Sequence, residues 1–229
     1  MNCLYCNQKI VKLLPIPELL LLRSIHANEL CNECLSNFRL IEKGANCPGC
    51  CREQQETSHC DDCRLWQQKY PDYKFQHTAL FHYNKEMKHW FEEYKFKGNY
   101  QLRFSFSKEI SGYLKNKNDY LIVPIPLSEQ RLKERRFNQV EGLLTGAGIS
   151  YSPLLLRNNE ERPQAQKNRE ERLAGQQPFC INAENKQQFK KRSVILVDDI
   201  YTTGRTLFFA AELFLEYPVE KIETFSLAR

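Results

Sequence analysis

Runs of hydrophobic residues in the second half of the chain predict strands of a buried sheet. Residues 120–123 are apolar and aromatic and are followed by two prolines, so we expect a strand that ends in a loop. Residues 194–197 form a continuous apolar run, typical of a strand buried on both faces. The nearly apolar residues 206–217 predict a helix, and residues 223–227 predict a last strand. This βαβ order predicts an α/β fold with a parallel sheet covered on both faces.

The remaining segments are more polar. Residues 94–98 end in a glycine and are typical of the end of a helix. The charged segment from Leu132 to Leu144 carries apolar residues at helical spacing and predicts one helix, which ends at the turn 146–148. Residues 157–175 lack a sustained apolar period and predict a mobile loop or an exposed helix.

The pattern divides the chain into two domains of unequal size. Its 229 residues suffice for one domain of about 150 residues with a small addition. Residues 1–66 are rich in cysteine, residues 67–76 are polar and predict a linker, and residues 77–229 carry the strand and helix patterns.

Composition indicates a soluble globular protein, because 41% of the residues are hydrophobic and 27% are charged. The longest apolar stretch, residues 13–22, contains two prolines and a glutamate and is shorter than the roughly 20 residues that cross a bilayer. It also lacks the basic start and the cleavage site of a signal peptide. We therefore expect a cytoplasmic protein without membrane insertion.

The distribution of charge argues against duplex DNA as the ligand of the cysteine-rich part. The formal net charge is +5, of which residues 1–66 contribute −1 and the rest +6. A protein that holds duplex DNA usually concentrates basic residues on the binding module. The mild positive charge of the larger domain suits a polyanionic small molecule as well as nucleic acid.

Eight of the ten cysteines form four C-x-x-C pairs within the first 63 residues. A disulfide framework needs an oxidising compartment, so reduced thiols that bind zinc are the better interpretation. Each pair supplies half of a tetrahedral shell, and four pairs therefore predict two closed, structural zinc sites. In sequence order, the first site consists of Cys3, Cys6, Cys31 and Cys34, and the second of Cys47, Cys50, Cys60 and Cys63.

Spacing alone leaves an interleaved arrangement open, in which Cys3 and Cys6 share an ion with Cys47 and Cys50. His59 is an alternative ligand, although it reads more simply as a polar neighbour of Cys60. So small a module buries little core, and metal binding is expected to supply its folding energy.

A second motif follows the apolar run 194–197. Asp198 and Asp199 stand at the carboxyl end of the predicted strand, where open α/β sheets bind ligands. The following loop, residues 202–206, is rich in threonine, contains one glycine and begins a helix. Its N–H groups therefore predict a phosphate site at this segment, which we call the threonine loop. The carboxylates then face sugar hydroxyls or a metal ion. Motifs of P-loop nucleotidases and of dinucleotide-binding enzymes are absent.

The run VILVDDIYTTGRT at 194–206 resembles the motif of type I phosphoribosyltransferases that binds 5-phosphoribosyl 1-pyrophosphate (PRPP). The whole chain resembles the ComF (ComFC) competence family, in which a zinc-ribbon module precedes such a domain. The run VPIPLSEQRLKERRFNQVEGL at 123–143 is similar to the second signature of that family. The resemblance implies a type I phosphoribosyltransferase fold with a parallel sheet.

The resemblance also implies roles for individual residues. Asp198 and Asp199 would be the catalytic pair that holds the ribose hydroxyls, while the threonine loop cradles the 5-phosphate and the second signature meets the pyrophosphate. Gln164 and Arg172 match a mobile loop whose closure would exclude water. Arg136 stands where the family usually has glycine. The implied PRPP-binding set is Asp198, Asp199, Tyr201, Thr202, Thr203, Gly204, Arg205, Thr206, Leu127, Ser128, Arg131 and Arg135.

Three hypotheses about function follow. The first is a phosphoribosyltransferase that uses PRPP with Mg²⁺ and an acceptor that the sequence does not identify. The second is a catalytically silent PRPP-binding adaptor in DNA uptake, whose zinc module docks a ComFA-like helicase or another competence protein. The third is a protein that binds single-stranded DNA through the basic domain and exposed aromatic residues such as Tyr94 and Phe96.

Overall fold

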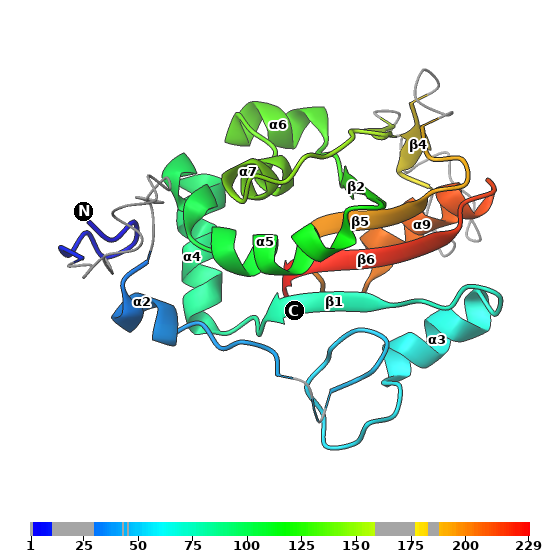
Figure 1. Ribbon diagram of the computed structural model, residues 1–229, viewed down its shortest axis with the longest axis horizontal. Helices are drawn as coiled ribbons and strands as arrows, with labels where there is room; N and C mark the ends of the chain where they lie inside the picture. Colours follow the sequence, from blue (N-terminus) through cyan, green and yellow to red (C-terminus); the bar gives the residue numbers. More distant parts are fainter. Residues whose placement is uncertain (1, 11–29, 43, 45, 159–176, 183–187) are drawn as a thin grey trace, which may run out of the picture.

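A four-stranded parallel sheet forms the centre of the molecule (Figure 1). The structure is a computed structural model that describes residues 2–10, 30–42, 44, 46–158, 177–182 and 188–229. The strands lie in the order β1 (His77–Phe81), β6 (Lys221–Ala228), β5 (Ser193–Ile200) and β2 (Tyr120–Pro124), and each adjacent pair is parallel. All three strands expected from the hydrophobic runs are therefore confirmed. A separate antiparallel pair consists of β3 (Leu155–Arg157) and β4 (Phe179–Ile181).

Helices cover both faces of the sheet, as the apolar strands require. Side chains of α4 (Lys85–Phe96), α5 (Ser107–Leu114) and α7 (Gln139–Gly146) fill the core on one face. The apolar helix α9 (Arg205–Leu215) fills the core on the other face. Two 3₁₀ helices, η1 (Tyr100–Phe104) and η2 (Lys115–Lys117), connect elements on the first face. The predicted α/β fold with a parallel sheet is confirmed.

The two halves of the cysteine-rich part pack on opposite faces of the sheet. Cys3 and Cys34, the latter on the short helix α2 (Asn32–Ser36), join the core on the side of α4. Cys47 and Cys63, the latter on α3 (Asp61–Lys69), join the core on the side of α9. Each cysteine cluster thus extends a different half of the hydrophobic core. The division of the chain at residues 66 and 76 stays a prediction.

The prediction of one helix from Leu132 to Leu144 is wrong, because the segment forms two. Helix α6 (Glu129–Arg135) ends where Arg136 adopts the left-handed conformation with φ of 66°. Asn138 then begins α7, since its side-chain oxygen accepts a hydrogen bond from the N–H of Val140 at 2.9 Å. Its amide also donates to the carbonyl of Ile125 at 3.1 Å, which fixes α7 to the end of β2.

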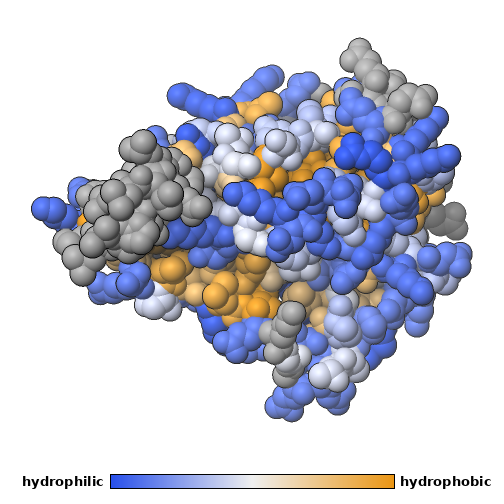
Figure 2. Space-filling model, in the orientation of Figure 1, coloured by the Kyte–Doolittle hydropathy of each residue, from blue (hydrophilic) through white to orange (hydrophobic). Residues whose placement is uncertain are grey.

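The surface view in Figure 2 is mainly hydrophilic, with hydrophobic residues gathered in limited areas. No helix among the described residues is both long enough and apolar enough to cross a membrane. The apolar stretch 13–22 lies outside the described residues. The expectation that Tyr94 is exposed is wrong: it is fully buried, and its hydroxyl donates to the carbonyl of Gln139 at 2.9 Å. Phe96 is 71% exposed, as expected.

The left-handed residue at the end of α6 yields a prediction about stability. Arg136 is exposed, and a residue with a Cβ is strained at this φ, which glycine adopts freely. We expect Arg136→Gly to raise the free energy of unfolding by about 1 kcal/mol. Denaturant titration measures the change. Lys133→Gly, at an exposed position within α6, is the control and is expected to lower it; equal effects of both variants would contradict the assignment.

Candidate functional site

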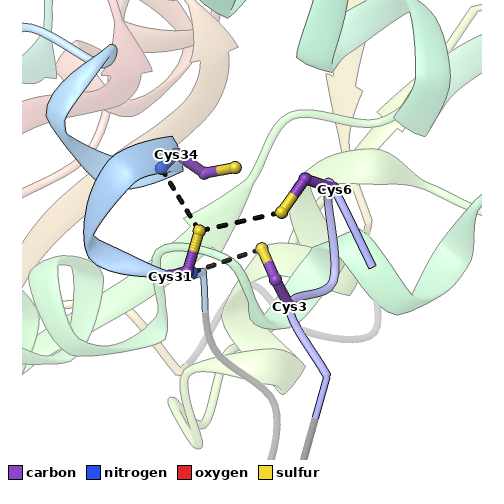
Figure 3. Close-up of side chains that lie close together, drawn as sticks. All are labelled: Cys3, Cys6, Cys31 and Cys34. Atoms are coloured by element: carbon purple, nitrogen blue, oxygen red, sulfur yellow. Dashed lines mark hydrogen bonds between the residues drawn. The ribbon is translucent and has the colours of Figure 1, made fainter. Parts of the chain in front are cut away.

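The first cysteine cluster brings Cys3 and Cys6 together with Cys31 and Cys34 (Figure 3). Their four Sγ atoms lie within 4.8 Å of one another, and those of Cys6 and Cys31 are 3.7 Å apart. Tetrahedral zinc with Zn–S bonds of about 2.3 Å separates its sulfur ligands by about 3.8 Å. The cluster therefore has the dimensions of a zinc site.

The second cluster consists of Cys47, Cys50, Cys60 and Cys63, all of them buried. Sγ distances of 3.6 Å join Cys47 to Cys63 and Cys50 to Cys60, which again fit tetrahedral zinc. The pairing in sequence order is confirmed, and the interleaved arrangement is wrong. Among the described residues, the groups that can hold a metal ion contain cysteines alone, without His59.

Cys50 has a second contact that the sequence does not predict. The guanidinium of Arg229 donates to Cys50 Sγ from Nη2 at 3.2 Å and from Nε at 3.4 Å. A hydrogen bond from Cys63 lowers the pKa of Cys50 to about 4 against the opposing effect of burial, and Arg229 adds to this lowering. Cys50 is therefore held as a thiolate, the form that binds zinc.

The acidic pair lies at the carboxyl end of β5, and its two side chains point to opposite faces of the sheet. Asp199 is buried on the side of α4, where its Oδ2 lies 2.5 Å from Nζ of Lys95. Although burial opposes ionisation, this ammonium group lowers the pKa of Asp199. Asp198 is half-buried; burial and the neighbouring charge of Asp199 raise its pKa to about 8. The pKa values of the two carboxyl groups are therefore shifted in opposite directions.

The threonine loop begins α9 and has an open side and a supported side. Thr202, Thr203, Arg205 and Thr206 are exposed, whereas Tyr201 is buried beneath the loop. Gly204 has a φ of 82°, and a Cβ there would lie 2.2 Å from the hydroxyl of Tyr201. Glycine is thus required at this position both by the backbone conformation and by the close approach of the tyrosine.

The loop after β2 reaches the same edge of the sheet. β2 pairs with β5, and the N–H of Ile125 donates to the carbonyl of Val197 at 2.9 Å, so Leu127 and Ser128 follow at the edge that carries Asp198. The Ser128 hydroxyl accepts a hydrogen bond from the N–H of Arg131 at 3.3 Å and begins α6.

Arg135 connects α6 to the acidic pair. Its Nη1 donates to Oε1 of Gln139 at 3.0 Å, and its guanidinium carbon lies 5.2 Å from the centre of the Phe96 ring. Burial lowers the pKa of Arg135, and the charge of Asp199 partly offsets this. Arg131 is exposed one turn earlier. The structure thus brings Asp198, Asp199, the threonine loop and α6 together, while Gln164 and Arg172 lie outside the described residues.

Four contributors to the site escaped sequence reasoning: Lys95, Gln139, Trp66 and Arg229. Lys95 is one of many lysines in a polar helix pattern, and Arg229 is separated from Cys50 by most of the chain, so no local signal marks either. Gln139 lies next to the Asn138 cap of α7, within the second signature. Trp66 donates from Nε1 to the carbonyl of Thr203 at 2.8 Å, a contact between distant segments.

Comparison with known proteins finds relatives that match the whole chain. Competence protein ComFC of Streptococcus pneumoniae (strain ATCC BAA-255 / R6) is 41% identical over 229 residues, which is 100% of both proteins. The chain belongs to the ComFC competence family. Competence protein ComFC of Bacillus subtilis (strain 168) is 32% identical over 99% of this chain and 94% of that protein. No protein-family model matches the chain.

A similar solved structure is a hypoxanthine phosphoribosyltransferase from Staphylococcus aureus. It is 14% identical, the match covers 57% of this chain and 65% of that one, and the TM-score is 0.33.

The unequal burial of the two cysteine clusters predicts two rates of metal release. Cys6 is exposed in the first cluster, whereas all four cysteines of the second are buried. We expect a chelator to take zinc from the first cluster faster, because it can reach that ion from solvent. Absorbance of 4-(2-pyridylazo)resorcinol measures release. Cys6→Ser should abolish only the fast phase and Cys60→Ser only the slow one; the reverse assignment would contradict the prediction.

The ion pair between Lys95 and Asp199 yields a prediction about stability. Side chains of both residues are at most 10% exposed, so Lys95→Met leaves a buried carboxylate without its partner. We expect the free energy of unfolding to fall by about 3 kcal/mol at pH 7.5 and to recover in part when Asp199→Asn is added. Denaturant titration of the variants measures both effects.

The stabilisation by the Lys95–Asp199 ion pair decreases at low pH. Lys95 lowers the pKa of Asp199, so the pair stabilises the fold above the ordinary aspartate pKa of about 3.9, and this stabilisation is lost as pH falls through the folded-state pKa. Lys97→Met on the same helix is the control, because Lys97 is exposed and is expected to contribute almost nothing. Equal losses in both variants would show that the buried pair has no special role.

Proposed function

We propose that this protein binds PRPP together with Mg²⁺ at the carboxyl edge of β5 and β2, and that it serves natural competence, as the names of its relatives indicate for them. The observation that supports this most is the junction of two features: a half-buried aspartate at the end of β5 and an open threonine loop that begins an eleven-residue helix. A single ligand that contacts both the aspartate and the loop must carry a diol and a phosphate at a fixed separation.

The phosphate belongs on the loop. The loop that leads into α9 exposes the side chains of Thr202, Thr203 and Thr206, and the helix macrodipole favours an anion at the start of α9. Among the described residues, no hydrogen bond from the N–H of Thr203 or Gly204 is formed within the protein. These donors are therefore available for the 5-phosphate of PRPP.

The ribose belongs on Asp198. Its carboxylate accepts a hydrogen bond from the N–H of Asp199 at 2.8 Å, and its remaining lone pairs can accept from the 2- and 3-hydroxyls of a ribose. Asp199 is occupied by Lys95 and is less accessible. We therefore assign hydroxyl recognition mainly to Asp198, and we assign to Asp199 the role of holding α4 against the end of β5.

The pyrophosphate belongs near the loop after β2. Leu127 and Ser128 follow β2 at the same edge, and Arg131 and Arg135 lie one helical turn apart on α6. Guanidinium groups bind phosphate oxygens through paired hydrogen bonds. Bound Mg²⁺ would neutralise the pyrophosphate charge as the bond at C1 breaks. The chain itself orients the sugar and holds both anionic ends, so positioning and electrostatic stabilisation carry the catalysis of any transfer step.

We also propose that both cysteine clusters hold zinc as structural ions, which their buried thiols and sulfur separations support. A catalytically silent PRPP-binding adaptor, docking a ComFA-like helicase or another competence protein, is the alternative within the same site. One observation supports the hypothesis of single-stranded DNA binding: the ring of Phe96 is exposed and lies beside the guanidinium of Arg135.

Calorimetric titration with PRPP and Mg²⁺ tests the proposal. Wild type should bind, and Asp198→Asn should weaken binding by at least about tenfold, because the amide cannot accept both hydroxyl hydrogen bonds. An unspecific anion site would respond in the opposite direction, since losing a carboxylate favours anion binding. Asp72→Asn makes the same substitution at an exposed position away from the site and should leave affinity unchanged.

Absence of binding by a folded, zinc-loaded wild type would refute the proposed ligand. Where binding occurs, release of pyrophosphate in the presence of candidate acceptors distinguishes a transferase from a silent adaptor. Displacement of a single-stranded oligonucleotide by PRPP would show that the two ligands share the site.

A further inference from the structure

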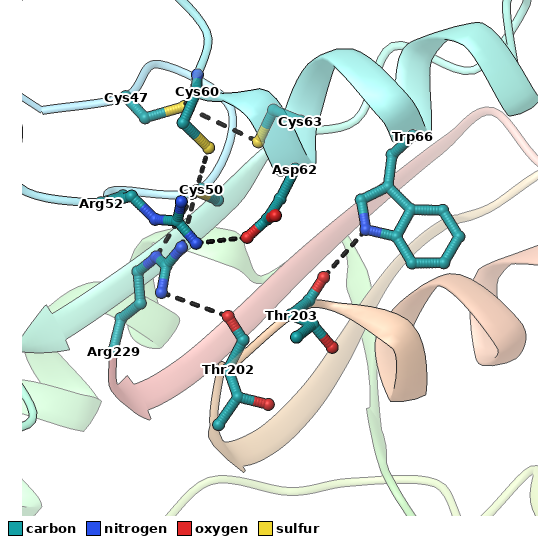
Figure 4. Close-up of polar contacts among 10 residues, drawn as sticks. All are labelled: Cys47, Cys50, Arg52, Cys60, Asp62, Cys63, Trp66, Thr202, Thr203 and Arg229. Carbon is teal, nitrogen blue, oxygen red and sulfur yellow. Dashed lines mark hydrogen bonds and ion pairs between the residues drawn. The ribbon is translucent and has the colours of Figure 1, made fainter.

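Two side chains connect the second cysteine cluster to the threonine loop (Figure 4). Arg229 donates from Nη1 to the carbonyl of Thr202 at 3.3 Å while its other nitrogens donate to Cys50. Trp66 donates from its indole nitrogen to the carbonyl of Thr203 at 2.8 Å. Two consecutive carbonyl groups of the loop are thus held from the same side, by residues of distant parts of the chain.

A peptide unit is planar and trans, so its C=O and its N–H point in opposite directions. The Thr202 carbonyl shares a peptide plane with the N–H of Thr203, and the Thr203 carbonyl shares one with the N–H of Gly204. Holding the two carbonyls toward the cysteine cluster therefore turns both N–H groups away from it, toward the open side of the loop.

Both holding residues are themselves fixed. Trp66 lies one helical turn after Cys63 on α3, and its ring stacks on Phe208 of α9 with centroids 4.1 Å apart and an interplanar angle of 12°. The Arg229 guanidinium carbon lies 4.9 Å from the centre of the Tyr201 ring. The Tyr201 ring in turn lies under Gly204. The contacts form a continuous path from Cys50 and Cys63 to the loop.

We infer that the second cysteine cluster is a positioning device, in which Arg229 and Trp66 orient the N–H groups of Thr203 and Gly204 toward an anionic ligand. Neither residue contacts the ligand side of the loop; each acts through a carbonyl. The cluster would then set the affinity of the loop for phosphate besides stabilising the fold. The part that concerns ligand affinity rests on the proposed binding of PRPP, whereas the part that concerns N–H orientation does not.

Zinc-loaded Trp66→Phe tests the inference most cleanly, because phenylalanine keeps a ring to stack on Phe208 but lacks the indole donor. We expect the amide resonance of Gly204 to shift, its hydrogen exchange to accelerate, and the dissociation constant for PRPP to rise about 3- to 10-fold. Arg229→Gln should shift the amide resonance of Thr203, accelerate its hydrogen exchange and raise the dissociation constant for PRPP in the same way. Zinc content and melting temperature are measured for each variant.

Arg64→Gln is the matched control, since Arg64 is an exposed arginine on α3 that pairs with Asp61 and does not touch the loop. It should leave both amides and the affinity unchanged. Should Arg229→Gln lose zinc, Trp66→Phe decides alone, because it leaves the contacts of Cys50 intact.

The inference would be overturned if the amide resonances of Thr203 and Gly204 did not shift in either variant. It would also be overturned if the wild type bound PRPP and the variants, despite shifted amide resonances, bound it with the same affinity. Failure of the wild type to bind PRPP refutes the proposed function instead, and the amide resonances then decide the orientation of the loop by themselves.

Discussion

Burial of strand β5 is the constraint on which the rest of the molecule depends. Residues 194–197 are apolar on both sides and therefore need a cover on each face of the sheet. Helices α4, α5 and α7 supply one cover, and α9 supplies the other. Polar groups have a place only where the strand leaves the core, so Asp198, Asp199 and the threonine loop are concentrated at its carboxyl end. The position of the site follows from this.

Each cysteine cluster completes one of these covers. Cys3 and Cys34 join the core beside α4, and the buried second cluster joins the core beside α9. A segment rich in polar residues contributes little hydrophobic area, and the metal ions that we propose for the two clusters would supply cohesion in place of apolar side chains. The second cluster packs in the same core as β5, and its neighbours Arg229 and Trp66 connect it to the threonine loop at the end of that strand.

Local patterns predicted strands β2, β5 and β6, the C-x-x-C pairing in sequence order and the place of the acidic pair at the end of β5, because each depends on a few neighbouring residues. Strands β1, β3 and β4 were not predicted. The break between α6 and α7 was missed, since an arginine in the left-handed conformation gives no hydrophobic signal. Lys95, Trp66 and Arg229 were missed for another reason. Their partners Asp199, Thr203 and Cys50 lie more than 100 residues away, so only the folded chain shows them. Tyr94 is buried although its segment mixes aromatic residues with charges, and its hydroxyl finds a partner in the carbonyl of Gln139.

The difference between the two aspartates follows from the alternation of a strand. Asp199 points to the face of α4, where Lys95 compensates its charge within the core. Asp198 points to the other face, where burial and its neighbour raise its pKa to about 8. A ribose hydroxyl donates a hydrogen bond to a carboxylate and favours its ionised form. A bound sugar would therefore stabilise the negative charge of Asp198, for which the described residues show no ion pair. Adjacent carboxyl groups can therefore have different roles: Asp199 forms a buried ion pair between β5 and α4, and Asp198 is the residue that we propose for ligand recognition.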